Sequence, residues 1–143
     1  MSDVFRTRRR VEWSDTDAAG IAHFTCFLRM MEQAEHDFLR SRDLSVHMTD
    51  AEGPISWPRV SVRCDFRVPV RFEDELDIDV HIDRLGTKSV TYAFRFQRDG
   101  QDIADGSITT VCCRLPRDGS SDPPQSIEVP EAIAAKLRGA STS

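Results

Sequence analysis

The stretch RVSVRCDFRVPVRFEDELDIDVHI, residues 59–82, carries the clearest structural pattern of the sequence. Apolar residues occupy every second position over 60–70 and again over 76–82, and most positions between them are polar. A period of two is typical of β-strands with one buried face. The same alternation recurs over 89–97, and an Asp-Gly turn signal then precedes a fourth strand, which we expect from about Asp102 to Leu115.

Opposite charges mark the polar faces of the first two of these strands. Arginines dominate the strand that begins at Arg59, and acidic residues dominate the strand that begins near Glu75. Such charges attract across neighbouring antiparallel strands, each pair contributing about 0.2–1 kcal/mol. Together with the short links 72–74 and 86–88, they predict a meander in which strands are neighbours in chain order. A further strand is expected over 5–13.

A different period, between three and four residues, runs through residues 23–41. Apolar residues recur there from Phe24 through Phe27 and Met31 to Phe38, while charged residues fill much of the remainder. This pattern predicts a helix of about five turns. One long amphipathic helix beside one antiparallel sheet indicates an α+β fold in which the helix packs across the sheet.

Two other segments lack either period. Residues 46–58 contain one glycine and two prolines and are expected to form a loop. Residues 116–125 are rich in proline, serine and aspartate, which indicates a linker, and a short helix is expected over 130–137. We therefore expect one domain at residues 1–115, followed at 116–143 by a linker, a short helix and a frayed tail.

Composition limits the class of protein. The 143 residues are 39% hydrophobic and 30% charged, which excludes a wholly disordered chain, and no run approaches the roughly 18 apolar residues of a membrane span. The net charge of -5 argues against a nucleic-acid partner, because phosphate binding rests on a basic surface. The first residues contain no apolar signal segment, so we expect a cytoplasmic protein.

The four cysteines show no metal-binding or redox pattern. They include no C-x-x-C pair, and Cys112 and Cys113 are adjacent in the chain. In a reducing cytoplasm they are expected to be free thiols, and no set of ligands has the spacing of a zinc site. Cys26 is expected to be a small buried hydrophobic residue, because no histidine is spaced to activate it.

The segment between the first strand and the long helix carries the candidate chemistry. Asp15 and Asp17 stand in a loop that ends at the start of the helix. Aspartates in such places commonly serve as turn or capping residues. A carboxylate beside the free N–H groups of a helix N-terminus can also act as a base or nucleophile next to an oxyanion site.

Residues 11–40, VEWSDTDAAGIAHFTCFLRMMEQAEHDFLR, resemble the N-terminal signature of the 4-hydroxybenzoyl-CoA thioesterase family of hot dog fold proteins. The family's Asp-x-Asp-x-x-Gly loop is matched by Asp15, Thr16, Asp17 and Gly20, and His23-Phe24 stands at its aromatic pair. The resemblance extends from about Arg10 to Leu115 and includes FRVPVRFEDEL, residues 66–76, and LGTKS, residues 85–89.

The resemblance implies a five-stranded antiparallel sheet wrapped around one long central helix, and hydrolysis of an acyl-CoA or related thioester. In that reaction Asp17 is the nucleophile or the general base, and the backbone N–H of Phe24 polarises the thioester carbonyl. Asp15 and Gly20 support the loop. Coenzyme A enters as part of the substrate, so no separate cofactor or metal is expected.

Other residues are candidates for supporting roles. His23 lies close enough to Asp17 in sequence to orient its carboxylate, although a histidine there commonly caps a helix. Glu32 is a candidate helix carboxylate, with an ion pair to His36 as its alternative. The resemblance places the coenzyme A contacts at the hairpin, where the candidates are Arg84, Lys88 and Ser89, with Arg59 as an alternative.

Relatives commonly carry Asn-Tyr where this chain has Cys26-Phe27, so its acyl pocket is expected to differ from theirs. Because relatives pair their sheets edge to edge, we expect a homodimer or homotetramer with the site between subunits. Two alternatives to hydrolysis stay open: a hot dog hydratase or dehydratase, and a non-catalytic module that binds acyl thioesters.

Overall fold

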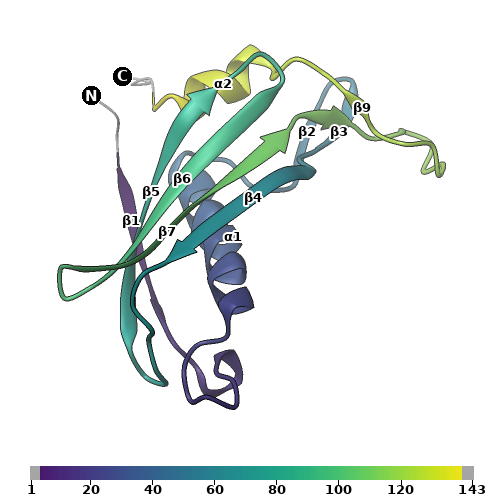
Figure 1. The fold of residues 1–143 in the computed structure, drawn as a ribbon. Helices are drawn as coiled ribbons and strands as arrows, with labels where there is room; N and C mark the ends of the chain where they lie inside the picture. Colours follow the sequence, from purple (N-terminus) through teal and green to yellow (C-terminus); the bar gives the residue numbers. More distant parts are fainter. Residues whose placement is uncertain (1–3, 140–143) are drawn as a thin grey trace.

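The computed structural model describes residues 4–139, and one curved antiparallel sheet around the long helix α1 dominates it (Figure 1). The elements in chain order are β1 (Phe5–Arg10), the 3-10 turn η1 (Trp13–Asp15), α1 (Phe24–Ser41), β2 (Met48–Asp50), β3 (Gly53–Ser56), β4 (Arg59–Phe66), β5 (Glu75–Leu85), β6 (Ser89–Arg98), β7 (Gln101–Val111), β8 (Cys113–Arg114), β9 (Gln125–Ser126) and α2 (Glu131–Leu137). The five-stranded sheet has the order β1-β5-β6-β7-β4. The predicted α+β architecture is confirmed.

The helix α1 packs its apolar stripe on the concave face of this sheet. Phe27, Met31 and Phe38 are buried there, and Phe27 contacts Phe96 of β6 edge to face at 5.2 Å between ring centroids. A glycine is required at Gly106 of β7, because a Cβ there would lie 2.5 Å from the backbone oxygen of Arg63 in β4 and 2.7 Å from the sulfur of Met31 in α1. The periodicity therefore identified both partners of the core.

The predicted meander is confirmed for β5, β6 and β7, which pair in chain order, and is wrong for β4. The acidic strand β5 lies between β1 and β6, whereas the arginine-bearing β4 pairs with β7 at the other side of the sheet. The acidic face of β5 is balanced by β1 instead, where Arg6 meets Asp79 at 2.6 Å and Arg8 meets Asp77 at 3.1 Å. Two strands offered similar arginine patterns, and the charges alone could not distinguish them.

The expected loop at 46–58 and the expected long strand at 102–115 also need correction. Residues 46–58 contain the hairpin β2–β3, which joins β8 and β9 in a second, four-stranded sheet. The long strand divides at Cys112, whose N–H donates to the carbonyl of Lys88 at 2.7 Å instead of continuing the β6–β7 ladder. The first strand ends at Arg10 rather than at residue 13.

The apolar face of β4 is less buried than its alternation predicts. Val60, Val62 and Phe66 are 61%, 47% and 51% exposed, because β4 is an edge strand that α1 covers only in part. Apolar residues on a sheet edge favour pairing with another chain. This edge is the most apolar exposed strand of the described residues.

The remaining predictions fall on the cysteines and the C-terminal segment. All four cysteines are free, and burial raises the pKa of the Cys26 thiol to about 11, which keeps it protonated. The short helix α2 begins at Glu131 and buries Ala134 and Leu137, while residues 140–143 lie outside the described part. Neither helix of residues 4–139 is long and apolar enough to cross a membrane.

Candidate active site

The loop between η1 and α1 is a closed turn centred on Asp17. The N–H of Asp17 donates to the carbonyl of Ile21 at 2.9 Å, and the N–H of Gly20 donates to the carbonyl of Asp17 at 2.9 Å. Gly20 has φ +79°, a backbone conformation that strains any residue with a side chain. The sequence folds tightly here because a glycine stands where the turn requires one.

The carboxylate of Asp17 has one engaged oxygen and one free oxygen. Its Oδ1 accepts the backbone N–H of Ala19 at 2.8 Å, which fixes the side chain against the loop. Among residues 4–139, Oδ2 has no hydrogen-bond partner. Half-buried and held at one oxygen, Asp17 can accept a proton or attack an electrophile with the other.

At the helix N-terminus next to this loop, one backbone N–H has a hydrogen-bond acceptor and another has none among the described residues. The residue His23 is the N-cap, and its Nδ1 accepts the N–H of Thr25 at 3.2 Å. The N–H of Phe24, the first helical residue, meets no acceptor within the described part of the chain. Such an N–H at a helix start favours a negative or polarised oxygen.

Asp17 and Phe24 line the same pocket, which has a volume of about 410 Å³. Its other walls are mostly apolar: Ile21, Ala22, Phe27, Phe66, Arg67, Val68, Pro69 and Val70. Phe27 from α1 and Phe66 from the edge strand β4 meet edge to face there, with ring centroids 5.3 Å apart. The pocket therefore places a carboxylate and a helix N-terminus beside a space that suits an apolar group.

Asp15 is oriented differently from Asp17. Its side chain is buried, 8% exposed, and accepts the N–H of Glu12 at 2.8 Å and a guanidinium N–H of Arg29 from α1. These contacts face a cleft between β1 and α1, distinct from the apolar pocket. Arg29 was not anticipated from the sequence, because a helix arginine beside charged neighbours looks like a solvated residue.

Glu32 and Arg59 meet each other rather than the pocket. Arg59 at the start of β4 lies 3.6 Å from Glu32 and forms a closer ion pair with Glu35, which is 1% exposed. Burial raises the pKa of Glu35 to about 7, although Arg59 acts to lower it. Sequence reasoning missed Glu35, and the one available signal was its place on the apolar stripe of the helix.

The predicted coenzyme A residues sit at the β5–β6 hairpin. Arg84 and Lys88 are exposed and Ser89 is half-buried, at the end of the sheet opposite the Asp17 loop (Figure 1). The strand β5 spans most of that separation, about 30 Å at the usual rise per residue. One chain therefore does not bring the hairpin and the Asp17 loop together.

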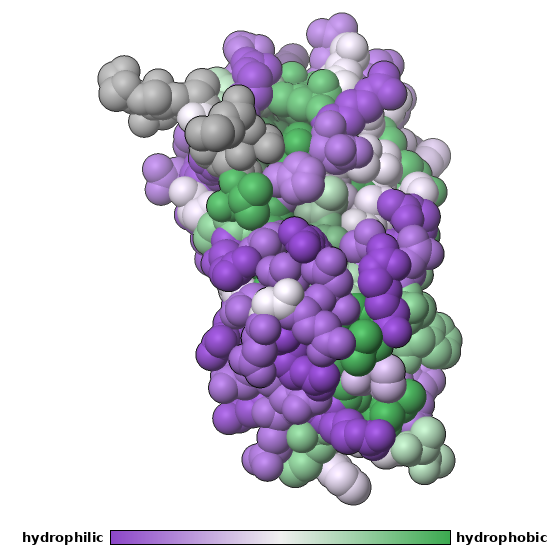
Figure 2. All heavy atoms as spheres, turned by 60° about the vertical axis from the view of Figure 1, so that its left-hand side comes forward, coloured by the Kyte–Doolittle hydropathy of each residue, from purple (hydrophilic) through white to green (hydrophobic). Residues whose placement is uncertain are grey.

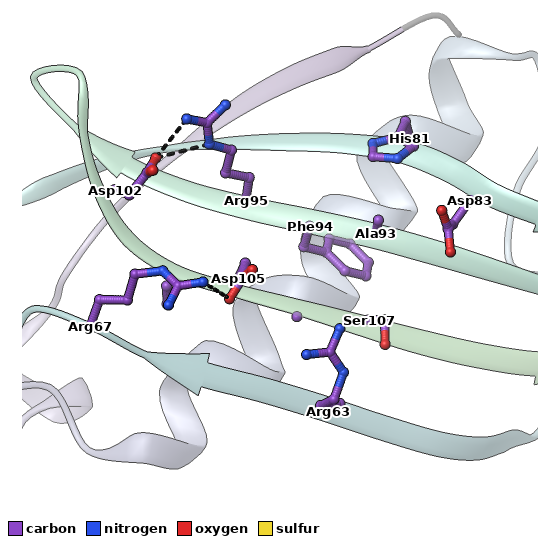
Figure 3. A pocket seen from close by; sticks show the side chains of 12 residues that line it. Arg63, Arg67, His81, Asp83, Ala93, Phe94, Arg95, Asp102, Asp105 and Ser107 are labelled. Carbon is purple, nitrogen blue, oxygen red and sulfur yellow. Dashed lines mark hydrogen bonds and ion pairs between the residues drawn. The ribbon is translucent and has the colours of Figure 1, made fainter.

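A second hollow, of about 370 Å³, lies on the outer face of the sheet (Figure 3). Arginine–aspartate pairs stand around it, including Arg67 with Asp105 at 3.0 Å and Arg95 with Asp102 at 2.8 Å. Three arginines and three aspartates line this hollow, so their formal charges cancel. Figure 2 shows one side of the molecule, on which hydrophilic residues cover a broad area. This hollow contains no carboxylate next to a free helix N–H.

The comparisons with known proteins concern the family and the fold of the chain. A 1,4-dihydroxy-2-naphthoyl-CoA hydrolase from Synechococcus sp. (strain WH7803) is 30% identical over 134 residues, covering 89% of this chain and 88% of that protein. The crystal structure of a 1,4-dihydroxy-2-naphthoyl-CoA thioesterase from Synechocystis matches with a TM-score of 0.81 at 25% identity, covering 94% of this chain and 96% of that one.

A 4-hydroxybenzoyl-CoA thioesterase, complexed with 4-hydroxybenzoyl-CoA, has a TM-score of 0.78 at 18% identity over 94% of this chain and 98% of that one, which shows likeness of fold. The fold is thus that of the hot dog thioesterases, as the sequence resemblance implied. The profile of the thioesterase-like superfamily matches residues 11–137. The chain belongs to this superfamily.

Proposed function

We propose that the protein hydrolyses an acyl-CoA thioester in the pocket shared by Asp17 and Phe24. The class of the enzyme, an acyl-CoA thioesterase, follows from its family and from the relatives described above. The observation that carries the site assignment is that one mostly apolar pocket is lined both by Asp17, which has one unpaired carboxylate oxygen among residues 4–139, and by Phe24, the first residue of the helix.

In the proposed reaction the thioester carbonyl oxygen accepts the N–H of Phe24, which polarises the carbonyl carbon. The free oxygen of Asp17 either attacks that carbon or removes a proton from a water molecule that does so. In the first route the carbon–sulfur bond breaks as a mixed anhydride forms on Asp17, the thiolate takes a proton from solvent, and a water molecule then hydrolyses the anhydride to the free acid and Asp17. In the second route the tetrahedral intermediate collapses to the free acid as the carbon–sulfur bond breaks, and protonated Asp17 returns its proton to the thiolate. His23 holds the helix start through Thr25, so its role is to fix the position of the Phe24 N–H.

The pocket supports an apolar acyl group. Apart from Asp17, its one charged wall residue is Arg67, which is already paired with Asp105. Three phenylalanines, Phe24, Phe27 and Phe66, supply aromatic surface that suits a flat or branched hydrocarbon. The named relatives act on hydroxylated aromatic acyl groups, and we propose that this chain accepts a less polar one.

A homodimer completes the site. The apolar edge of β4, with Val60, Val62 and Phe66, is proposed to pair antiparallel with the same strand of a second copy. Antiparallel pairing brings the β5–β6 hairpin end of one chain towards the Asp17 loop of the other. Arg84, Lys88 and Ser89 would then contact the nucleotide of a coenzyme A bound at the partner's loop.

An acyl-CoA panel tests the proposal. Short, branched, long and aromatic acyl-CoAs are offered to the full chain, and release of free thiol is followed. Thiol release from at least one apolar acyl-CoA supports the proposal. Water addition to an enoyl-CoA without thiol release would favour a hydratase, and tight binding without turnover across the panel would favour a binding module; either result would overturn it.

A further inference from the structure

We propose that Arg29 is a positioning residue that sets the geometry between Asp17 and the N–H of Phe24; this inference rests on the proposed function. Arg29 touches neither of these groups. It acts through Asp15, which it binds from the second turn of α1. The inference concerns the step at the reacting carbonyl rather than the binding of coenzyme A.

The contact between Arg29 and Asp15 ties the turn η1 to the body of the helix. One carboxylate oxygen of Asp15 accepts the Arg29 guanidinium, and the other accepts the backbone N–H of Glu12. Since both oxygens of this buried carboxylate are engaged, its position is fixed relative to both elements. Arg29 lies about one and a half turns beyond Phe24, so it fixes the helix by a point other than its first residue.

A second tie runs through the backbone of the same residue. The carbonyl of Asp15 accepts the N–H of His23 at 2.7 Å, and an isolated β-bridge joins Thr16 to Ala22 just inside it. These two contacts join the two ends of the loop that carries Asp17, and the second end leads directly into the helix. Without Arg29, the His23 contact and the Thr16–Ala22 bridge still join the loop to the helix start, but the Asp15 carboxylate no longer holds η1 to the second turn of the helix.

Small shifts of the Asp17 loop against the helix start matter for the reaction. The Asp17 oxygen and the Phe24 N–H must address the carbon and the oxygen of one carbonyl, so their separation has little tolerance. A displacement of about 1 Å between such groups can cost about 100-fold in rate. Binding of the rest of the substrate depends less on this separation, because half of the pocket wall comes from residues 66–70 and the hairpin lies at the other end of the sheet.

A purely structural role predicts a different result. The Arg29 side chain is half exposed, but its partner Asp15 is buried, so loss of the guanidinium leaves a buried carboxylate with one partner fewer and lowers Tm whatever the role of Arg29. A positioning role in addition lowers kcat at a temperature where the variant is fully folded, and a purely structural role does not. Arg40, in the same helix, offers a matched control, because it also pairs with an aspartate, Asp37, at 2.9 Å but lies at the far end of the helix.

The experiment compares wild type, Arg29→Met, Arg29→Lys, Arg40→Met and Asp17→Asn with the best acyl-CoA of the panel. For Arg29→Met we expect kcat, measured at a temperature where the variant is fully folded, to fall by about 10- to 100-fold, with KM changed less than about threefold, while Tm also falls. Arg29→Lys keeps a positive charge beside the Asp15 carboxylate, so its kcat should lie between those of Arg29→Met and wild type, even if Arg29→Met folds poorly. Arg40→Met should match wild type.

Unchanged kcat in Arg29→Met, with Asp17→Asn inactive, would overturn the positioning role and leave the proposed function standing. A fall in kcat that appears only at temperatures where Arg29→Met is partly unfolded, and that Arg29→Lys does not relieve, would also overturn it. If the wild-type protein hydrolyses no acyl-CoA, the proposed function itself fails, and the inference fails with it.

Discussion

The carbonyl oxygen of Asp15 accepts the backbone N–H of His23 at 2.7 Å, and this bond closes the loop that holds Asp17 at the start of α1. Because His23 is the N-cap, the next N–H, that of Phe24, is left without an acceptor in the described chain. A single backbone contact thus brings the candidate carboxylate and the candidate oxyanion donor to one pocket.

Removal of the Phe24 N–H alone should slow hydrolysis. In Phe24→Pro the donor is lost, yet proline is well tolerated at the first helical position. The preceding residue, His23, already has φ -66° and ψ 144°, the conformation that a residue before proline prefers. We expect kcat to fall by about 100- to 1,000-fold, measured as thiol release.

The matched variant Phe24→Ala loses the same ring but keeps the N–H, so its kcat should stay far above that of Phe24→Pro. Circular dichroism checks that both helices are intact. Equal kcat values in the two variants would show that the Phe24 N–H does not bind the carbonyl oxygen.

A charge on the apolar edge of β4 should separate the subunits. Val62 is half exposed on this edge, and Val62→Lys would place a buried charge in a β4–β4 contact. We expect sedimentation analysis to give wild type a molar mass of at least two chains and Val62→Lys the mass of one chain. The monomeric variant should have little thioesterase activity. A wild-type monomer that hydrolyses acyl-CoA at full rate would contradict the shared site.

Replacement of Lys88 should raise KM for thioesters that carry the coenzyme A nucleotide and leave KM unchanged for thioesters that lack it. A contact with a phosphate contributes about 1.5–3 kcal/mol, so Lys88→Ala should raise KM for acyl-CoA by about tenfold or more. The KM for the matching acyl-N-acetylcysteamine thioester should not change. Lys136→Ala, at the other lysine of the sequence, is the control; equal KM changes for both thioesters would argue against the hairpin site.

The buried Glu35 should make stability depend on pH. Burial raises its pKa from 4.5 to about 7, so between these values the folded protein holds a proton that the unfolded chain has released. The free energy of unfolding should therefore fall as pH rises from about 4.5 to about 7, by on the order of 3 kcal/mol, and then level off.

Urea unfolding at several pH values measures this dependence. Glu35→Gln should abolish the Glu35 part of the slope, and Glu32→Gln should reduce it, because the neighbouring Glu32 charge also raises the pKa of Glu35. A wild-type slope that survives unchanged in Glu35→Gln would mean that other groups titrate in this range.

Local sequence patterns predicted where helices and strands form better than they predicted which strands pair with each other. The helix expected over 23–41 begins at Phe24 and ends at Ser41, because its apolar period needs only the helix itself. The partner of β5 could not be predicted in this way, since Arg6 and Arg8 of β1 offer the same charges as the arginines of β4. Pairing between distant strands depends on the path of the chain, which alternation does not encode.

The candidate site divides in the same manner. Asp17, Gly20 and Phe24 lie within one short loop, so the sequence motif was enough to select them. Phe66 reaches the pocket from β4, and Arg29 binds Asp15 from α1, and on the sequence both look like ordinary strand or helix residues. The roles proposed for Asp17, His23, Glu32 and the hairpin stay predictions until they are measured.

The most direct test compares kcat for thiol release by wild type and Asp17→Asn with the best acyl-CoA, with Asp83→Asn on the exposed part of β5 as control. Asparagine can still accept the Ala19 N–H, so the loop should keep its shape. We expect kcat to fall by about 100- to 10,000-fold in Asp17→Asn alone. Wild-type kcat in a folded Asp17→Asn protein would contradict the assignment of the reaction to this carboxylate.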